Sequence, residues 1–210
     1  MIRILISDEN AIVREGLKHI IAQTDDMTVS GEAENGFCLL DKLRQRRFDV
    51  LLLDIGLPEK NGLELLKQVK NELPRFPVLV LTMHHDEQYA LRALRAGASG
   101  YLTEETAPEQ VIAAIRKVAI GGRYISPDLA ERLAIIAVGD ISKARHEILS
   151  DREYQVFCMI ASGKSPSQIA VELSLSVKTI STHRARLLEK MQMKNNSELT
   201  RYALQNRLVD

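Results

Sequence analysis

The chain has 210 residues, of which 45% are hydrophobic and 4% aromatic, so one or two domains with mainly aliphatic cores are expected. Its formal net charge is zero, but residues 1–140 carry 17 basic and 21 acidic side chains, whereas residues 141–210 carry 11 and 7. No segment has about 18 consecutive apolar residues and the two cysteines are isolated, which excludes a transmembrane helix and a disulfide framework. We expect a cytoplasmic protein with an acidic first module and a basic second module that meets nucleic acid.

Over the first 120 residues, short apolar runs alternate with segments of helical period. Three continuous runs are typical of strands buried on both faces of a parallel sheet, at residues 4–6, 50–53 and 78–81. Two weaker strand candidates lie at residues 27–30 and 100–102. Helices are expected after each strand, near residues 11–23, 35–45, 62–72, 86–97 and 107–120. Five β-α repeats predict an α/β domain at residues 1–121, with a five-stranded doubly wound parallel sheet.

The pattern changes after residue 121. Residues 122–147 are expected to hold a short helix, from Ser126 to about residue 138, and then a polar, aperiodic linker at 139–147. Residues 148–210 show only helical patterns, with four helix starts at Ser150, Ser165, Ser176 and Asn196. Because a tight turn joins the second of these helices to the third, the sequence predicts a small all-α helix-turn-helix domain.

Acidic and hydroxyl side chains follow three of the expected strands. Asp8 and Glu9 follow the first strand, Asp54 follows the third and Thr82 follows the fourth. Because the carboxyl ends of parallel strands lie side by side, Asp8, Glu9 and Asp54 are expected to converge. Three carboxylates that repel one another favour a hard cation with oxygen ligands, such as Mg²⁺. The alternative is that these acids only cap the helices that follow them.

Four segments of residues 2–121 resemble the receiver domain of bacterial two-component response regulators: ILISDENAIVREGL, FDVLLLDIGLPEKNGLEL, PVLVLTMH and AGASGYL. The resemblance implies that Asp54 accepts a phosphoryl group from a sensor histidine kinase. It also implies that Glu9, Asp54 and the backbone carbonyl of Gly56 bind Mg²⁺, while Asp8 holds metal-bound water. A carboxylate oxygen can attack phosphorus when Mg²⁺ screens its charge, so the chemistry agrees with these roles.

Other positions match the receiver pattern less directly. Thr82 matches the hydroxyl that closes on the phosphoryl group, and Tyr101 matches the aromatic side chain that swings inward with it. Pro58 and Gly62 match the turn and the helix start after the acceptor. An alternative is a haloacid-dehalogenase-type phosphatase, which also has an aspartyl nucleophile, but that class needs a second Asp where this chain has Gly56.

Glu104 is the one departure from the receiver pattern. Typical receivers end the fifth strand with a Lys that pairs with the phosphoryl group, and Glu104 stands in that place. Two like charges about 4 Å apart repel by on the order of 4 kcal/mol at intermediate dielectric, so we hypothesise weakened phosphorylation or a biased switch. In the alternative, Glu104 turns to solvent and signalling survives. Glu104 also favours a second functional class, a phosphorylation-independent DNA-binding regulator whose receiver is a dimerisation or ligand module.

Residues 149–209 resemble the DNA-binding tail of NarL/FixJ regulators, which is of the LuxR type, most strongly at SPSQIAVELSLSVKTISTHRARLLEKM. At about 100° per residue, Ile180, Leu187 and Met191 share the inward side of one helix, and its opposite side can enter a major groove. Arg184 and Lys190, nearer the edges, are expected to contact phosphates. The expected DNA-binding residues are Lys178, Thr179, Ser181, Thr182, Arg184, Ala185, Arg186 and Lys190.

The two resemblances together imply a transcription regulator and not an enzyme. They imply promoter DNA, a sensor histidine kinase and RNA polymerase as partners. The last helix presents Leu199, Tyr202 and Ala203, and in this family the equivalent helix often pairs two DNA-bound copies. A homodimer on a twofold-symmetric DNA site is therefore expected.

Overall fold

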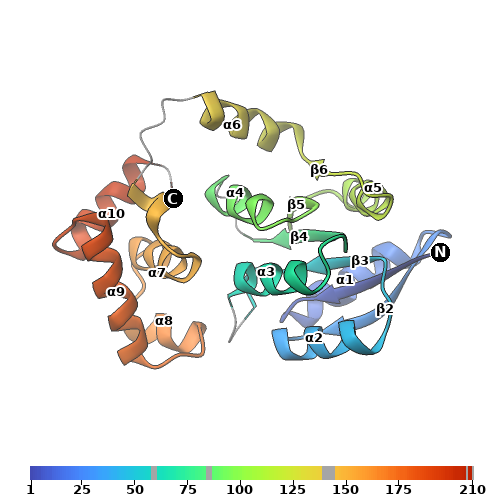
Figure 1. Cartoon of the computed structure of the whole chain (residues 1–210), viewed down its shortest axis with the longest axis horizontal. Helices are drawn as coiled ribbons and strands as arrows, with labels where there is room; N and C mark the ends of the chain where they lie inside the picture. The colour runs from blue at the N-terminus through green and yellow to red at the C-terminus, as the bar shows by residue number, and fades with distance from the viewer. Residues whose placement is uncertain (58–60, 84–86, 139–144, 207, 210) are drawn as a thin grey trace. The chain divides into compact units, whose positions relative to one another are not determined.

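The computed structural model describes residues 1–57, 61–83, 87–138, 145–206 and 208–209 (Figure 1). The chain divides into two compact units, Met1–Ala137 and Val138–Asp210. The first unit contains a parallel sheet with helices on both faces, and the second is entirely helical. Each helix in the described ranges is too short or too polar to span a lipid bilayer.

The sheet of the first unit has strand order β2-β1-β3-β4-β5-β6, and every neighbouring pair is parallel. Its strands are β1 (Ile2–Ser7), β2 (Met27–Ala33), β3 (Val50–Leu53), β4 (Val78–Thr82), β5 (Gly100–Thr103) and β6 (Tyr124–Ile125). The doubly wound sheet of five strands is confirmed. The sixth strand was not predicted, because two residues that pair only with Gly100 and Tyr101 at an edge leave no pattern in the sequence.

Five helices connect the strands and cover both faces of the sheet: α1 (Ala11–Ala22), α2 (Gly36–Gln45), α3 (Gly62–Glu72), α4 (Glu87–Arg95) and α5 (Pro108–Ala119). Asparagine side chains cap the first three helices, since Asn10, Asn35 and Asn61 each accept a hydrogen bond from a first-turn N–H. The predicted helix at 86–97 is observed as Glu87–Arg95, and residue 86 lies outside the described residues.

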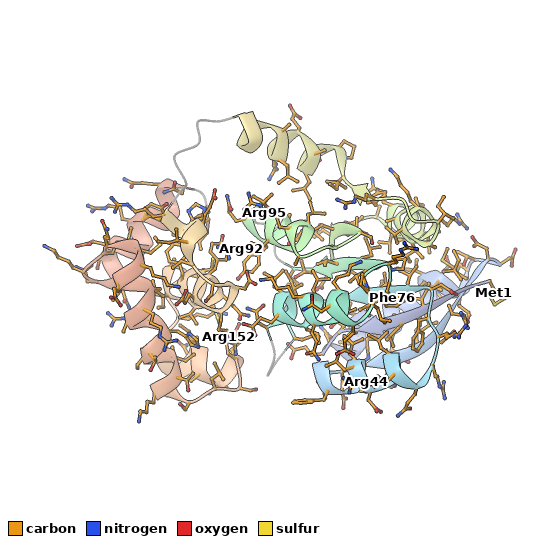
Figure 2. All side chains as sticks on the ribbon, in the orientation of Figure 1. Met1, Arg44, Phe76, Arg92, Arg95 and Arg152 are labelled. Atoms are coloured by element: carbon orange, nitrogen blue, oxygen red, sulfur yellow. The ribbon has the colours of Figure 1, made fainter. Side chains whose placement is uncertain are left out.

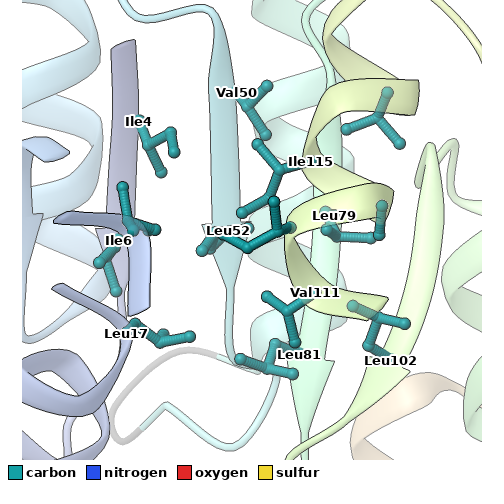
Figure 3. Close-up of a cluster of buried hydrophobic side chains, with 14 of the residues drawn as sticks. Ile4, Ile6, Leu17, Val50, Leu52, Leu79, Leu81, Leu102, Val111 and Ile115 are labelled. Carbon is teal, nitrogen blue, oxygen red and sulfur yellow. The ribbon is translucent and has the colours of Figure 1, made fainter. Parts of the chain in front are cut away.

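One core lies between the sheet and helices α1 and α5 (Figure 3). Ile6, Leu52 and Leu81 come from three strands, and Leu17 and Ile115 come from the two helices. Each side chain is at most 6% exposed. Burial of one such aliphatic side chain contributes roughly 1.5–3 kcal/mol, so this face fixes the strand register and the positions of the strand ends.

After β6, helix α6 (Pro127–Val138) confirms the short helix expected from Ser126. Residues 139–144 of the expected linker lie outside the described residues. The rest of that linker is corrected, because residues 145–147 belong to the 3-10 helix η1 (Arg145–Ile148). Its His146 is 3% exposed and its Nδ1 lies 3.0 Å from the Tyr202 hydroxyl, an aromatic contact that the polar sequence of the segment did not reveal.

The second unit has the four predicted helices: α7 (Asp151–Ala161), α8 (Pro166–Glu172), α9 (Val177–Met191) and α10 (Asn196–Gln205). The capping boxes predicted at Ser150 and Ser165 are both present, and Ser176 caps α9. The core side chains of these helices are 0% exposed: Tyr154, Phe157, Ile169, Ile180, Leu187, Met191, Leu199 and Ala203. The predicted inward side of α9 is therefore confirmed.

Candidate functional sites

The first candidate site is a pair of carboxylates at the carboxyl edge of the sheet. Ser7 and Leu53 are partners in the β1–β3 register, so the residues that follow them, Asp8 and Asp54, emerge side by side. The Asp54 N–H donates to the Ser7 carbonyl at 2.8 Å, which holds the two strand ends together. Asp8 is only 4% exposed. The sheet therefore places two acids together where water has little access.

The carboxyl group of Asp54 lies in an environment that disfavours its charge. Burial raises its pKa to about 7, and the negative charges of Asp8 and Glu104 act in the same direction. Hydrogen bonds from the Gly56 N–H (2.9 Å to Oδ1) and the Thr82 side chain lower the pKa but do not compensate. No basic side chain of the described residues lowers the pKa of Asp54. A cation beside Asp54 would relieve this unfavourable charge.

Gly56 leaves room for the carboxyl group of Asp54. A Cβ atom at position 56 would lie 2.9 Å from Asp54 Oδ2 and 3.4 Å from Oδ1. A similar restriction applies at Gly62, where a Cβ atom would lie 2.3 Å from the Cα of Ile55. Glycine at these two positions allows the segment after β3 to fold back beside the acid pair. Pro58, expected in the same turn, lies outside the described residues.

Glu9 differs from the acid pair in its exposure. Its side chain is exposed, whereas that of Asp8 is buried, and Glu9 lies in a bend beyond the end of β1. The described residues contain no group of three or more His, Cys, Asp and Glu side chains arranged to hold a metal ion. The structure places Asp8 beside Asp54, and the convergence of Glu9 with them and its metal-binding role stay predictions.

Glu104, directly after β5, interacts with the acid pair. Its N–H donates to the Thr82 carbonyl at 3.0 Å, and its side chain is half-buried. Burial raises the pKa of Glu104, and the charge of Asp8 raises it further. Since Glu104 in turn raises the pKa of Asp54, the three carboxylates interact electrostatically. Glu104 thus adds negative charge to the site, as the sequence suggested.

Arg14 is a residue of this site that the sequence reading missed. Its Nη1 donates to the backbone carbonyls of Asp8 (2.8 Å) and Glu9 (3.2 Å), and its Nε donates to Glu32 (3.2 Å). Burial raises the pKa of Asp8, while a hydrogen bond from the Asn10 N–H and the charge of Arg14 lower it. The signal was the position of Arg14 on the first turn of α1, directly after the acids.

Two further predicted residues of this site are buried. Thr82 is 1% exposed at the end of β4, and its side chain hydrogen-bonds to Asp54. Tyr101 is 3% exposed within β5. In the parallel register of β4 and β5, Tyr101 is aligned with Val80 and Leu102 with Leu81. Tyr101 therefore lies two positions before the level of Thr82, near the carboxyl edge of the sheet.

The second candidate site is the outer side of α9. Lys178, Ser181, Thr182, Ala185 and Arg186 are all exposed there. The hydroxyls of Ser181 and Thr182 donate to carbonyls one turn earlier in the helix, at 2.9 Å and 3.0 Å. Their oxygens therefore remain available as acceptors. This side combines two basic residues, two hydroxyls and a methyl group, which suits the major groove of DNA.

Three other predicted DNA contacts also have partners within the domain. Lys190 Nζ lies 2.7 Å from Oε2 of Glu153, whose side chain is 5% exposed. Arg184 Nε donates to Asn196 Oδ1 at 2.7 Å, which connects α9 to α10. Thr179 lies 2.8 Å from the Ser176 hydroxyl through its own oxygen. Lys190 and Arg184 therefore also stabilise the helix packing, a role that helical spacing alone did not reveal.

The apolar stripe of α10 is mostly used inside the domain. Leu199 and Ala203 are 0% exposed, and the half-buried Tyr202 contacts His146. Leu204, at 52% exposure, is the large apolar side chain that α10 leaves accessible among the described residues. Contact between two copies through α10 would have to use Leu204 and its polar neighbours.

Two protein-family models match the chain. The model described as "Response regulator receiver domain" matches residues 4–116, and "Bacterial regulatory proteins, luxR family" matches residues 147–203. Relatives of similar length include the response regulator GacA of Pseudomonas viridiflava, 34% identical over 100% of this chain and 99% of the relative. The oxygen regulatory protein NreC of Staphylococcus carnosus is 34% identical, with 99% of each chain covered.

Solved structures of response regulators also match the chain. The response regulator ChrA of a heme-sensing two-component system is 31% identical, with a TM-score of 0.55 over 99% of this chain and 98% of that chain. RcsB of Salmonella enterica serovar Typhimurium, solved bound to the promoter P1flhDC with the phosphomimetic BeF3-, is 26% identical, with a TM-score of 0.62. That match covers 96% of this chain and 97% of RcsB.

Proposed function

Because this chain belongs to the response regulators that combine a receiver domain with a LuxR-type DNA-binding domain, we propose that phosphorylation of Asp54 controls its binding to promoter DNA. Family membership makes the chain a transcription regulator and not an enzyme. Its phosphodonor is a sensor histidine kinase. The main support is Asp54 itself, a half-buried acid directly after β3 that also accepts a hydrogen bond from Thr82.

The transfer needs an ionised and accessible carboxylate. An oxygen of Asp54 forms a bond to phosphorus while the nitrogen–phosphorus bond of the kinase phosphohistidine breaks, and the released imidazole takes up a proton. Thr82 and the Gly56 N–H already contact Asp54, so they can position the acceptor and its phosphorylated form. Tyr101 is proposed to respond to the movement of Thr82.

The residues around Asp54 fit Mg²⁺. Two carboxylates share an edge of the sheet, and burial, together with the charges of Asp8 and Glu104, raises the pKa of Asp54 to about 7. Asp8, Asp54 and the Gly56 carbonyl would hold the ion, and Glu9 is proposed to take part from its exposed position. When bound, Mg²⁺ supplies positive charge that keeps Asp54 ionised and neutralises phosphoryl oxygens.

Glu104 is proposed to weaken this phosphorylation or to shorten its lifetime. Its charge raises the pKa of Asp54, the charge of Asp8 raises the pKa of Glu104 itself, and a phosphoryl group would add further negative charge beside it. The same observation favours a second function, DNA binding that does not depend on phosphorylation, with the receiver as a dimerisation or ligand module. The function that depends on phosphorylation is favoured by the arrangement of the acceptor site, in which Asp8 and Thr82 are buried beside Asp54.

DNA binding is proposed for the outer side of α9, where the basic residues Lys178 and Arg186 are exposed. Arg184 and Lys190 are proposed as phosphate contacts that also hold the domain together. RcsB binds promoter DNA and has been solved as dimers on DNA, and by analogy this chain is proposed to act as a homodimer on promoter DNA in the cytoplasm. RNA polymerase is a proposed further partner there.

One experiment separates the two functions. The affinity of the native chain and of Asp54→Asn for a promoter fragment is measured with and without acetyl phosphate and Mg²⁺. Regulation by phosphorylation requires that the phosphodonor strengthen DNA binding of the native chain and leave Asp54→Asn unchanged. Equal affinities in all four conditions would support the phosphorylation-independent function instead.

A further inference from the structure

At the edge of the sheet opposite Asp54, we propose a docking groove for an acidic peptide segment that also carries apolar side chains. The groove has a volume of about 660 Å³ and lies between the segments that follow α2 and α3. We call it the arginine groove, and the residues that define it are Leu43, Arg46, Arg47, Leu73, Arg75 and Phe76. Its location goes beyond the proposed phosphorylation and DNA-binding functions, because it uses none of their residues.

The groove carries positive charge that its own acids do not balance. Four arginines and two acids line it. Asp49 is held by Arg3, with Oδ1 3.0 Å from Nη2 and Oδ2 3.1 Å from Nε. Glu72 is held by Arg44 at 3.4 Å and by Gln68 at 3.0 Å.

Both acids of the groove are therefore already engaged. Arg46, Arg47 and Arg75 are exposed, and within the described residues their side chains have no ion pair or hydrogen bond. Three guanidinium groups thus remain available for an outside partner. They offer the fork of donors that binds carboxylates in pairs.

Helix ends do not account for Arg47 and Arg75. A basic side chain stabilises a helix when it lies in the last turn, where it balances the partial negative charge of the free carbonyls. Lys42 and Arg44 do this in α2, and Lys70 does it in α3, where its Nζ also donates to the Phe76 carbonyl at 2.7 Å. Arg46 is the C-cap residue of α2, whereas Arg47 and Arg75 come after the helices have ended.

The apolar part of the groove decides between peptide and nucleic acid. Leu73 is 40% exposed, and Leu43 and Phe76 are half-buried, so apolar surface adjoins the free arginines. Phe76 is labelled in Figure 2. Nucleic acid binds arginines chiefly through its phosphates and would leave this apolar surface uncovered. A peptide with both carboxylate and apolar side chains can cover both, as protein interfaces commonly do. An acidic peptide is therefore the occupant that the groove favours.

The test uses the full chain and a defined probe. A fluorescein-labelled ten-residue peptide of Asp, Glu, Leu and Phe is titrated in low salt and followed by anisotropy. Two matched peptides replace its acids by Asn and Gln or its apolar residues by Ser. We expect the acidic apolar peptide to bind at least about tenfold more tightly than either matched peptide, since charge-assisted hydrogen bonds and apolar contacts both contribute.

Variants connect the binding to the groove. Arg46→Gln/Arg47→Gln and Arg75→Gln are expected to weaken peptide binding by about tenfold or more, because each removes charge-assisted hydrogen bonds. Arg95→Gln is the matched control, an exposed arginine of α4 outside the groove, and should leave binding unchanged. Leu73→Ser should weaken binding without changing charge. Melting temperatures of all variants confirm that they are folded.

Three outcomes would overturn the proposal. The first is equal binding of the acidic and neutral peptides, and the second is equal loss of affinity in Arg95→Gln and the groove variants. The third uses inorganic polyphosphate and a short DNA duplex as competing probes. If either binds more tightly than the peptide and loses affinity in the same groove variants, the site belongs to a phosphate polymer and not to a peptide.

Discussion

The N–H of Glu104 donates a hydrogen bond to the carbonyl oxygen of Thr82 at 3.0 Å. This bond between β4 and the residue after β5 fixes the backbone of Glu104 beside the residue whose side chain contacts Asp54. Movement of Thr82 and the position of Glu104 are therefore coupled through the backbone. Glu104 therefore lies in the part of the domain that is proposed to respond to phosphorylation.

Replacement of this acid by lysine should strengthen phosphorylation. In Glu104→Lys, a repulsive charge becomes an attractive one, so with acetyl phosphate and Mg²⁺ we expect a several-fold higher yield of phospho-Asp54 and a changed lifetime. Glu105→Lys makes the same change of charge at the next, exposed residue and is the control. Phosphate-affinity electrophoresis measures both quantities. Identical yield and lifetime in native protein and Glu104→Lys would rule out the proposed role of Glu104.

A methyl group at position 56 should impair the acceptor without unfolding the domain. In Gly56→Ala, the new Cβ would lie 2.9 Å from Asp54 Oδ2, so the carboxyl group must shift and phosphorylation should fall by about tenfold or more. Gly16→Ala is the control, because a Cβ there meets nothing within 4 Å and lies in the interior of α1. That variant should phosphorylate normally and gain roughly 0.5–1 kcal/mol of stability. Native-like phosphorylation of Gly56→Ala would contradict the expected crowding.

Basic residues of α9 should differ in how they affect DNA binding. Lys178→Ala and Arg186→Ala should weaken binding and each reduce the slope of log K against log salt by about 1. Lys190→Ala should lower the slope less and the melting temperature more, since Lys190 is paired with Glu153. Anisotropy with a promoter fragment over a range of salt measures the slopes. A full unit of slope lost in Lys190→Ala, with no change in melting temperature, would show that it is mainly a DNA contact.

The pair of Lys190 and Glu153 should make the DNA-binding domain sensitive to acid. Burial opposes the charge of Glu153, but hydrogen bonds from Lys190 and Ser150 outweigh it, so the pKa of Glu153 lies below its usual value of 4.5. A lowered carboxyl pKa contributes stability that is present above the unfolded pKa and is lost as the pH falls through the folded pKa. We expect Glu153→Gln to cost about 1–2 kcal/mol at pH 7.

That cost should decrease at low pH. Calorimetry of native chain and Glu153→Gln at pH 7, 5 and 3 should show a difference in melting temperature that is present at pH 7 and 5 and smaller at pH 3. Lys190→Met removes the partner and is the second variant, with the same expected trend. A constant difference between native and variant at all three values would mean that ionisation of Glu153 does not stabilise the domain.

Features that repeat along the chain could be predicted from the sequence. The buried runs of β3 and β4 have no polar interruption, so they identified the strands and placed Asp54 and Thr82 at the same edge. The caps at Ser150, Ser165 and Ser176 located three helix starts, because a capping side chain acts on its own first turn. Local signals of this kind survive without knowledge of the tertiary structure.

Features made by distant residues could not be predicted. The two-residue strand β6 exists because β5 offers an unpaired edge, and the burial of His146 depends on Tyr202, 56 positions later. Arg14 and Lys190 can pair with many acids and carbonyls, and only the tertiary structure determines which of these lie within reach. For Glu9, its position after the strand suggested convergence with Asp8 and Asp54, but the sequence did not reveal that its side chain is exposed.

Strand β3 sets the spacing between the two ends of the receiver. Asp49 lies at the arginine groove and Asp54 follows the strand, so the two positions are separated by roughly 17 Å of extended chain. A peptide in the groove and a phosphoryl group on Asp54 are too far apart to touch or to exclude each other. If both proposals hold, the receiver can bind a peptide and carry a phosphoryl group at the same time. Transcription could then depend on two separate inputs.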